Sequence, residues 1–486
     1  MSGTGGPWHR AYVDRVLRPD QGYAASHLQD AFLDVLTAHV RTIARLPAAE
    51  GHGATLAALD AALQDQRTQP PPPFESGVPD LYFALQRRLE AKLGEEALGW
   101  LRLGLSRNDL DMTVYKVAAR GRLLHLARRL GELQDALLTQ AEAHVETVVI
   151  ARTHHQPAQP STLAHLLAAV AAGVARDQRR LLGVLERLDA CPLGACALSG
   201  TSHPLDRAWS AAALGFTEPV QNAYDAVAAS DWQLDLAALA QTLAVHRSRS
   251  VQLLMPWAES GALRLPDGLA QGSSIMPQKR NPVGLEHART RLSRAAGAAQ
   301  QLAFLSHNVP LADLNDGGTD AQEPLHDALE GLDAGLELLT AVVRESTWDT
   351  GLLAHEAAAS DTTATELADE LVRVAGLPFP LAHRRVAELV RRLAAEGRPL
   401  QRATPADLEA IGGPALDPET LAAALSPRAF VERRRGVGGP APAVVQADLA
   451  RMRREQAEYH DVVATATSKV EGALRRLRGP GKDVQR

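Results

Sequence analysis

Residues 123–137 read LLHLARRLGELQDAL, and the spacing of their leucines decides the fold class. The leucines of this apolar seam follow one another at intervals of three, four, three and four residues: Leu123, Leu126, Leu130, Leu133 and Leu137. Such intervals place the side chains along one side of an α-helix, as in a coiled coil. The surrounding pattern predicts a long helix over residues 109–147. Because so narrow a seam is rarely buried by one helix alone, we expect a helical bundle that several copies of the chain share.

Three further segments repeat this pattern, over residues 160–189, over residues 224–256 and from Pro282 to about Leu305. Alanine and leucine dominate the chain and β-branched residues are sparse, which favours helix over sheet. The expected fold class is therefore all-α.

A chain of 486 residues is too long for one simple core. We expect an N-terminal helical domain over residues 1–104, a central long-helix bundle domain over residues 105–355, and a C-terminal helical domain over residues 356–486. The proline run at residues 70–73 interrupts the first of these, since proline cannot lie inside a helix. The last is expected to hold shorter helices, a glycine-rich turn and a basic tail whose charges face solvent.

Composition excludes several classes of function. The net charge of −6 gives no electrostatic case for a nucleic acid or an anionic membrane as partner. Cys191 and Cys196 are the two cysteines, too few for a disulfide framework or a four-cysteine zinc site. Residues 1–20 lack the apolar core of a signal peptide, and no run is apolar enough to span a membrane. We expect a cytoplasmic protein without a metal or a cofactor.

The loop that carries the most chemistry is Gly272-Ser273-Ser274-Ile275-Met276-Pro277-Gln278-Lys279-Arg280-Asn281-Pro282. Its glycine and prolines indicate a loop rather than a helix or strand. A glycine lets such a loop swing, so its serines could be carried onto a bound substrate. If the loop folds back, Ser273, Lys279 and Asn281 could surround one small anion. The alternative is a surface loop with a chance pair of serines.

Two other polar segments flank long helices. In Ser106-Arg107-Asn108-Asp109, the forked guanidinium of Arg107 suits a carboxylate and the amide of Asn108 can donate a further hydrogen bond. Ser106 or Asn108 could equally cap the helix that starts here. The segment RTHHQPAQP, residues 152–160, is a loop whose histidines could act as acid, base or donor. Adjacent histidines do not by themselves form a metal site.

A serine base needs help, because an alcohol is a weak base. Lys279 and nearby amide N–H groups could stabilise its alkoxide. A carbanion beside a carboxylate also needs donors, for which Arg107, Lys279 and Asn281 are suitable. Glu286, on the helix after Pro282, could hold a histidine in one orientation.

Together the three segments resemble the signature regions of the fumarase/aspartase superfamily, whose loop reads GSS-x-MP-x-K-x-NP, and within it the argininosuccinate lyase family. The resemblance covers roughly residues 75–455. It implies an all-α homotetramer around a twenty-helix core, with each active site drawn from three subunits. It also implies anti β-elimination of an N-substituted aspartate to fumarate and an amine or guanidine, without a cofactor.

The resemblance also assigns roles to individual residues. Ser273 would be the base, with Lys279 and Asn281 on the substrate carboxylates, His154 paired with Thr153, and Glu286 the histidine's partner. The implied catalytic residues are Ser273, His154, Lys279 and Glu286. The implied substrate-binding residues are Ser106, Arg107, Asn108, Thr153, Ser274 and Asn281.

The sequence departs from the family where the leaving group should bind. The family's H-T-G-R-S-R-N-D is here RLGLSRND, residues 102–109, and the Tyr, Gln and Lys of its Y-N-K-D-M-Q-E-D-K-E-P stretch are absent from residues 313–324. Ser230 stands where the family has arginine. The elimination chemistry is thus kept while the amino-side pocket is rewritten. The leaving amine stays open: argininosuccinate, or the substrate of a nitrosuccinate, aminocarboxylate or, less favoured, adenylosuccinate lyase. A crystallin-like paralogue without activity is the alternative outside the enzymes.

Overall fold

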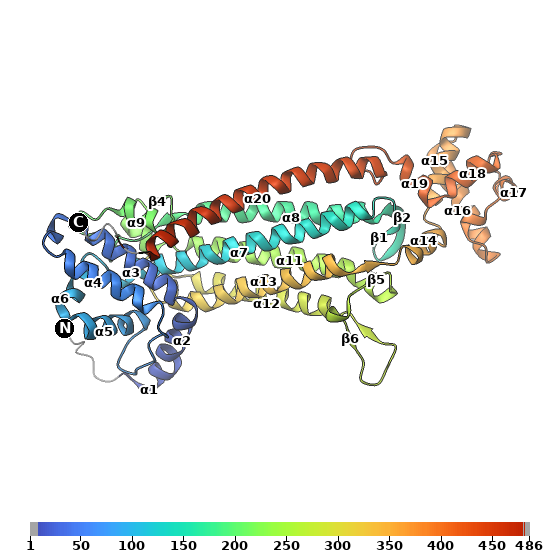
Figure 1. The fold of residues 1–486 in the computed structure, drawn as a ribbon. Helices are drawn as coiled ribbons and strands as arrows, with labels where there is room; N and C mark the ends of the chain where they lie inside the picture. The colour runs from blue at the N-terminus through green and yellow to red at the C-terminus, as the bar shows by residue number, and fades with distance from the viewer. Residues whose placement is uncertain (1–7, 480, 482–486) are drawn as a thin grey trace.

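The computed structural model describes residues 8–479 and 481, and long helices dominate it (Figure 1). The helices that run along the bundle are α7 (Arg107–Ala143), α8 (Leu163–Leu188), α11 (Asp231–Ser260), α12 (Val283–Ser306), α13 (Gln322–Glu345) and α20 (Pro442–Arg478). The all-α fold class is confirmed, and the four predicted long helices lie where the leucine pattern places them. In the part of the chain that the structure describes, no helix is long and apolar enough to cross a membrane.

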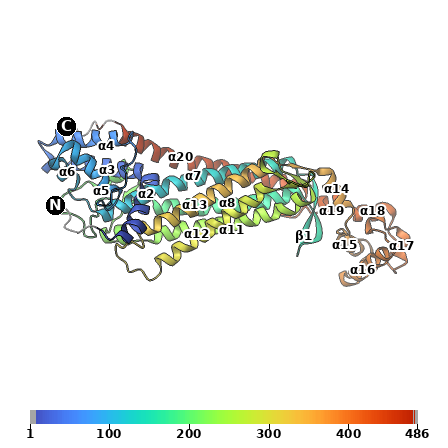
Figure 2. The same cartoon turned by 90° about the horizontal axis from the view of Figure 1, so that it is seen from below.

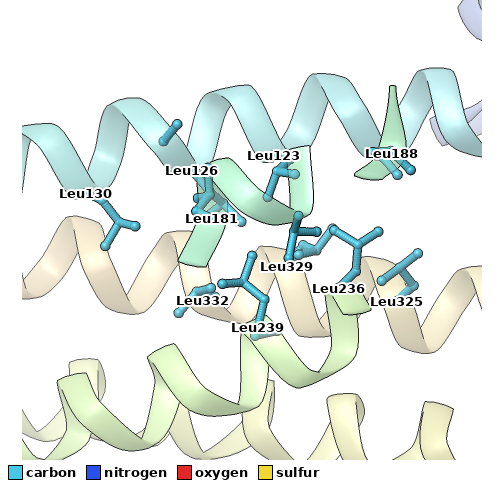
Figure 3. Packing of buried hydrophobic residues seen from close by; sticks show 14 of the residues in the cluster. Leu123, Leu126, Leu130, Leu181, Leu188, Leu236, Leu239, Leu325, Leu329 and Leu332 are labelled. Atoms are coloured by element: carbon cyan, nitrogen blue, oxygen red, sulfur yellow. The ribbon is translucent and has the colours of Figure 1, made fainter. Parts of the chain in front are cut away.

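The predicted seam forms the middle of the main core. All five seam leucines of α7 are at most 2% exposed. Figure 3 shows Leu123, Leu126 and Leu130 facing leucines of the neighbouring helices, among them Leu236 of α11 and Leu329 of α13. Burying one leucine side chain stabilises the fold by about 1.5–3 kcal/mol. The stripe is therefore one contribution among those of many buried residues in the same core.

The strands are short and occur in pairs at the ends of the helices. Two antiparallel pairs hold predicted site residues: β1 (Val148–Thr153) with β2 (Gln156–Thr162), and β6 (Gln271–Gly272) with β7 (Arg280–Asn281). The other two pairs are β3 (Ala190–Cys191) with β4 (Glu218–Pro219), and β5 (Leu263–Arg264) with β8 (Thr347–Trp348). Each pair fixes where a loop leaves the bundle.

A group of shorter helices covers the end of the bundle where α7 begins. They are α1 (Arg10–Tyr12), the π-helical turn Val13–Leu17, α2 (Arg18–His27), α3 (Gln29–Ile43), α4 (Gly53–Gln66), α5 (Leu81–Leu93) and α6 (Glu95–Leu101). The proline run lies between α4 and α5, outside any helix, as predicted. Short helices α9 (Arg207–Ala213) and α10 (Ala223–Ala228) precede α11.

A second, smaller apolar core lies beyond the other end of the bundle (Figures 1 and 2). Its region contains α14 (Thr350–Ala358), α15 (Ala364–Ala375), α16 (Phe379–Ala395), α17 (Pro405–Glu409), α18 (Pro418–Leu425) and α19 (Pro427–Arg433). The helix α20 then turns back along α7 and α8. Residues 356–486 thus contain both a small separate core and a bundle helix, and the three-domain division stays a prediction.

The segment after the glycine-rich turn is basic, as predicted, but the expectation that the C-terminal region holds only shorter helices was wrong. The chain there forms α20, whose buried residues repeat the spacing of four and three residues seen in α7: Val445, Leu449, Met452, Gln456, Tyr459 and Val463. The Gln456 amide donates to the carbonyl of Gly131 at 3.0 Å, and the Tyr459 hydroxyl donates to the carbonyl of Ala127 at 2.9 Å. Numerous arginines on the outer side of α20 had hidden this seam.

Candidate active site

The first polar segment begins α7. Ser106 is the N-cap of the helix in a capping box with Asp109, so the capping interpretation holds for Ser106. Asp109 is fully buried and accepts backbone N–H hydrogen bonds from Ser106 at 2.9 Å and from Gly194 at 2.8 Å. This second bond ties the start of α7 to the loop after β3. Arg107 and Asn108 are therefore held on a fixed first turn.

The guanidinium of Arg107 is already paired with carboxylates of its own chain. Its Nε donates to Oδ1 of Asp111 at 3.2 Å, its Nη1 forms an ion pair with Asp80, and its Cζ lies 5.4 Å from the ring centroid of Tyr82. Burial raises the pKa of Asp111 to about 6, although the Arg107 charge acts to lower it. Arg107 is thus neutralised locally, which was not foreseen from the sequence.

Asn108 points to a different element. Its amide donates to a carboxylate oxygen of Asp313, in the loop between α12 and α13. Burial raises the pKa of Asp313, while Arg107 and the Asn108 hydrogen bond lower it. The loop between α12 and α13, where the family's Tyr, Gln and Lys are absent, therefore contacts the first polar segment directly.

These residues line a cavity of about 530 Å³ at the covered end of the bundle. Its walls come from the N-terminal helices, the first turns of α7 and the loop that contains Asp313. Burial, followed by the charges of Asp320 and Glu323, raises the pKa of Asp20 in this cavity to about 6. The volume falls within the range of small-molecule sites.

The second polar segment forms the tip of the β1–β2 hairpin. Thr153, His154 and His155 are exposed, and both histidines have positive φ, 50° for His154 and 60° for His155. Two residues in the left-handed region are what a tight hairpin turn of this kind requires, and such turns normally use Asn-Gly. Histidines in this conformation cost of order 1–3 kcal/mol each. Because Asn-Gly would fit this turn with less strain, the functional role of the histidine pair stays a prediction.

The third segment is the loop between β6 and β7, which projects from the bundle (Figure 1). The hydroxyl oxygen of Ser273 accepts hydrogen bonds from the backbone N–H groups of Ile275 at 3.3 Å and Met276 at 3.1 Å. Lys279 and Ser274 are exposed, Asn281 is half-buried, and Glu286 is exposed on the first turn of α12. The side chain of Ile275 is 83% exposed, although it is apolar. Within its own chain this loop is not covered.

One chain does not bring the three segments together. Arg107 begins α7 and the hairpin follows its end, so the 37 residues of the helix separate them by about 55 Å. The bond between Asn108 and Asp313 puts the end of α12 beside the start of α7, and the Ser273 loop precedes the other end of α12. The β6–β7 loop and the β1–β2 hairpin thus share one end of the bundle, and the group of N-terminal helices covers the opposite end (Figure 1). The start of α7 lies at this opposite end. Among the described residues, no hydrogen bond or ion pair links the three segments.

Sequence reasoning missed the carboxylates around Arg107. Asp111 could have been found if the helix had been predicted to begin at Arg107 and not at residue 109, since residues four apart meet on the helix surface. Asp80 caps α5, where its side chain accepts from the Phe83 N–H at 3.0 Å. Its approach to Arg107 depends on tertiary packing and has no local signal in the sequence.

Comparisons with known proteins show which family the chain belongs to. Residues 20–297 match the family described as "Lyase", and residues 361–432 match the family described as "Argininosuccinate lyase C-terminal". The fold and these matches define a carbon–nitrogen lyase of the fumarase/aspartase superfamily.

Individual relatives narrow the class. The chain is 33% identical over 446 residues to argininosuccinate lyase 2 of Agrobacterium fabrum, covering 89% of this chain and 87% of the relative. It is 35% identical over 429 residues to the argininosuccinate lyase of Methanoculleus marisnigri, covering 86% of each. The chain belongs to the argininosuccinate lyase family.

Solved structures show the same fold over nearly the whole chain. EDDS lyase in complex with formate matches with a TM-score of 0.85 and 25% identity, covering 100% of this chain and 97% of that one. A variant of EDDS lyase with bound fumarate matches with a TM-score of 0.84 and 25% identity, covering 99% and 96%. The chain is thus similar in fold to both EDDS lyase structures.

Proposed function

We propose that this enzyme catalyses anti β-elimination of an N-substituted aspartate, with fumarate and an amine as products. A base removes a proton from the β-carbon, the methylene group between the nitrogen-bearing carbon and the side-chain carboxylate. The C–H electron pair becomes the new double bond. The carbon–nitrogen bond breaks at the same time or next, and the amine leaves with its electron pair and takes up a proton. The reaction is redox-neutral and requires no cofactor.

The observation that carries this proposal is the position of the Ser273 hydroxyl. Its oxygen accepts two backbone N–H hydrogen bonds, from Ile275 and Met276. Hydrogen bonds to the charged form favour that form, so this arrangement stabilises a serine alkoxide that acts as a base. Lys279, six residues along the same loop, adds a positive charge. A relative of the same fold that holds fumarate supports the choice of product.

The other predicted residues receive roles in the same proposal. Lys279 and Asn281 bind the substrate carboxylates, with Ser274 and Thr153 as further donors. His154 is the proton donor or acceptor at the leaving side, oriented by Glu286 of another copy. At the remaining segment, Asn108 is the direct substrate contact, with Ser106 fixing the turn. Because Arg107 is neutralised by Asp80 and Asp111, we assign it to holding that turn and its cavity as well as to binding.

We further propose that the active form is a cytoplasmic homotetramer whose sites each draw one segment from three copies. Separation of the segments by the length of α7 in one chain supports this assembly. So does the exposure of the hairpin tip and of Ile275, which a neighbouring copy would cover.

The test of the function is fumarate release, followed by its ultraviolet absorbance, from a set of N-substituted aspartates. Ser273→Ala should lower turnover by about 10²–10⁴-fold, the usual contribution of a general base. Ser293→Ala is the matched control, since this hydroxyl lies on the exposed side of α12 and bonds only to the carbonyl of Arg289, at 2.9 Å. Release of fumarate by Ser273→Ala at the rate of the unmodified enzyme would show that the base is another residue.

A further inference from the structure

The cavity beside Arg107 has an unusual balance of charge. Among the described residues, its lining contains five carboxylates and one basic side chain, Arg107. The carboxylates are Asp20, Asp80, Asp111, Asp313 and Asp320. We call this space the acidic cavity.

The one cation does not balance these carboxylates. Arg107 pairs with Asp80 and Asp111. The Asp313 carboxylate receives a hydrogen bond from the neutral amide of Asn108. Among the described residues, neither Asp20 nor Asp320 has an ion-pair partner. The Asp20 carboxylate, half-buried near Asp320 and Glu323, has its pKa raised to about 6 by burial and by those charges. The cavity thus keeps a negative charge that a bound cation would neutralise.

The rest of the wall suits a hydrocarbon chain. Leu28, Phe32 and Met112 are buried and apolar, and Tyr115 is 4% exposed. Tyr12 and Tyr23 also line the space. Aromatic rings attract cations over their faces, and aliphatic walls favour methylene groups. An extended alkyl amine would therefore find both parts of its structure matched.

The acidic cavity is continuous with the proposed active site through Asn108. This residue belongs to the substrate-binding segment, and its amide contacts Asp313 on the cavity wall. If the aspartyl end of a substrate is bound at Asn108, the part that extends into the cavity is the group attached to its nitrogen. The cavity is therefore the place where the leaving amine is recognised.

We propose that the leaving amine carries a second cationic nitrogen, an alkylammonium or a guanidinium, at the end remote from the aspartyl group and carries no carboxylate or phosphate. An anionic group there would face several carboxylates, and the described residues of the same chain add no unpaired cation to the cavity wall. Like charges in a partly desolvated site repel strongly. This inference rests on the proposed function and specifies its substrate class.

The test compares three synthetic substrates of nearly equal length: N-(4-aminobutyl)aspartate, N-pentylaspartate and N-(4-carboxybutyl)aspartate. Fumarate release gives kcat/KM for each. We expect the cationic substrate to exceed the neutral one by about 10- to 100-fold, the range that a hydrogen bond between charged groups confers. The anionic substrate should be slower than the neutral one.

Two conservative variants localise the effect. Asp20→Asn and Asp313→Asn should each lower the ratio of kcat/KM between the cationic and neutral substrates by about tenfold or more. Asp448→Asn, on the outer side of α20 and remote from the cavity, should leave the ratio unchanged. Sedimentation of each variant verifies that the fold and assembly are retained, and Asp313 is exposed on a loop where the change is easily accommodated.

The outcomes separate this inference from the proposed function. Two results would overturn the inference and leave the elimination intact. In the first, the enzyme releases fumarate but prefers the neutral or the anionic substrate. In the second, the ratio of kcat/KM between the cationic and neutral substrates is unchanged in both variants. If no N-substituted aspartate releases fumarate, neither these three, nor argininosuccinate, nor the substrates of the sister lyases, the elimination itself is refuted. The inference then falls with it.

Discussion

Mixing two inactive variants should restore activity, because the three polar segments of one chain lie too far apart to form one site. The 37-residue helix α7 sets about 55 Å between Asn108 and the hairpin that carries His154. Asn108→Ala and His154→Ala proteins are each expected to be inactive. When they are dissociated, mixed in equal amounts and reassembled, a site that takes the two residues from different copies finds both intact in about one case in four.

The assay is fumarate release after the exchange, with native mass spectrometry to count mixed assemblies. About a quarter of the activity of the unmodified enzyme should return for this pair. The same fraction is expected for His154→Ala with Ser273→Ala if those segments also come from different copies, and no recovery if they come from the same copy. Each variant taken through the procedure alone is the control. Mixed assemblies without any recovery for the Asn108 and His154 pair would refute the argument from distance.

Three further changes test the energetics. Leu130→Ala, at a fully buried position of the α7 seam, should lower the free energy of unfolding by about 2–5 kcal/mol in urea, whereas Leu311→Ala, 66% exposed, should change it little. His155→Gly should raise the unfolding free energy by about 1 kcal/mol, because glycine adopts its positive φ without strain; a loss of stability would contradict the strain. Asp111 has a folded-state pKa raised to about 6, so the folded protein binds the extra proton between about pH 4 and 6. The proton bound by Asp111 stabilises the folded protein at the lower pH, and this stabilisation is lost as the pH rises through 6. Asp111→Asn should remove this pH dependence from the free energy of unfolding measured across the range.

The bundle could be predicted from the sequence because burial along a helix leaves a periodic record. The α7 leucines are spaced regularly and nothing in the stretch competes with that pattern. In α20 the same spacing is present, but it includes Gln456 and lies among many arginines. The long side chains of arginine cover the outer face, and the glutamine is buried because its amide bonds to the carbonyl of Gly131 and to the side chain of Gln178. A polar residue in a seam can be assigned to the core only when its partner is known, and the partner lies on another helix.

One part of the candidate site could likewise be predicted from the sequence, and another part could not. Ser273, Lys279 and Asn281 lie in one loop, so their spacing could be read directly. The pairing of Arg107 with Asp80 could not be predicted from the sequence. Asp80 caps a different helix and meets Arg107 only after the N-terminal helices pack on α7. The acidic cavity depends on the same packing, since Asp20 and Asp313 come from opposite parts of the sequence. The sequence thus indicates the reaction better than the substrate.

The directions of the helices lead to one further step about assembly. The β1–β2 hairpin follows the end of α7, and the Ser273 loop precedes α12, which runs back toward Asn108. Both exposed segments therefore lie at one end of the bundle, and the acidic cavity lies at the other. Copies packed in parallel would place like ends together and leave the three segments about as far apart as they are in one chain. Antiparallel packing of the long helices places the hairpin and loop of some copies against the cavity end of another, so it is the arrangement in which the strained histidines and the exposed Ile275 acquire partners.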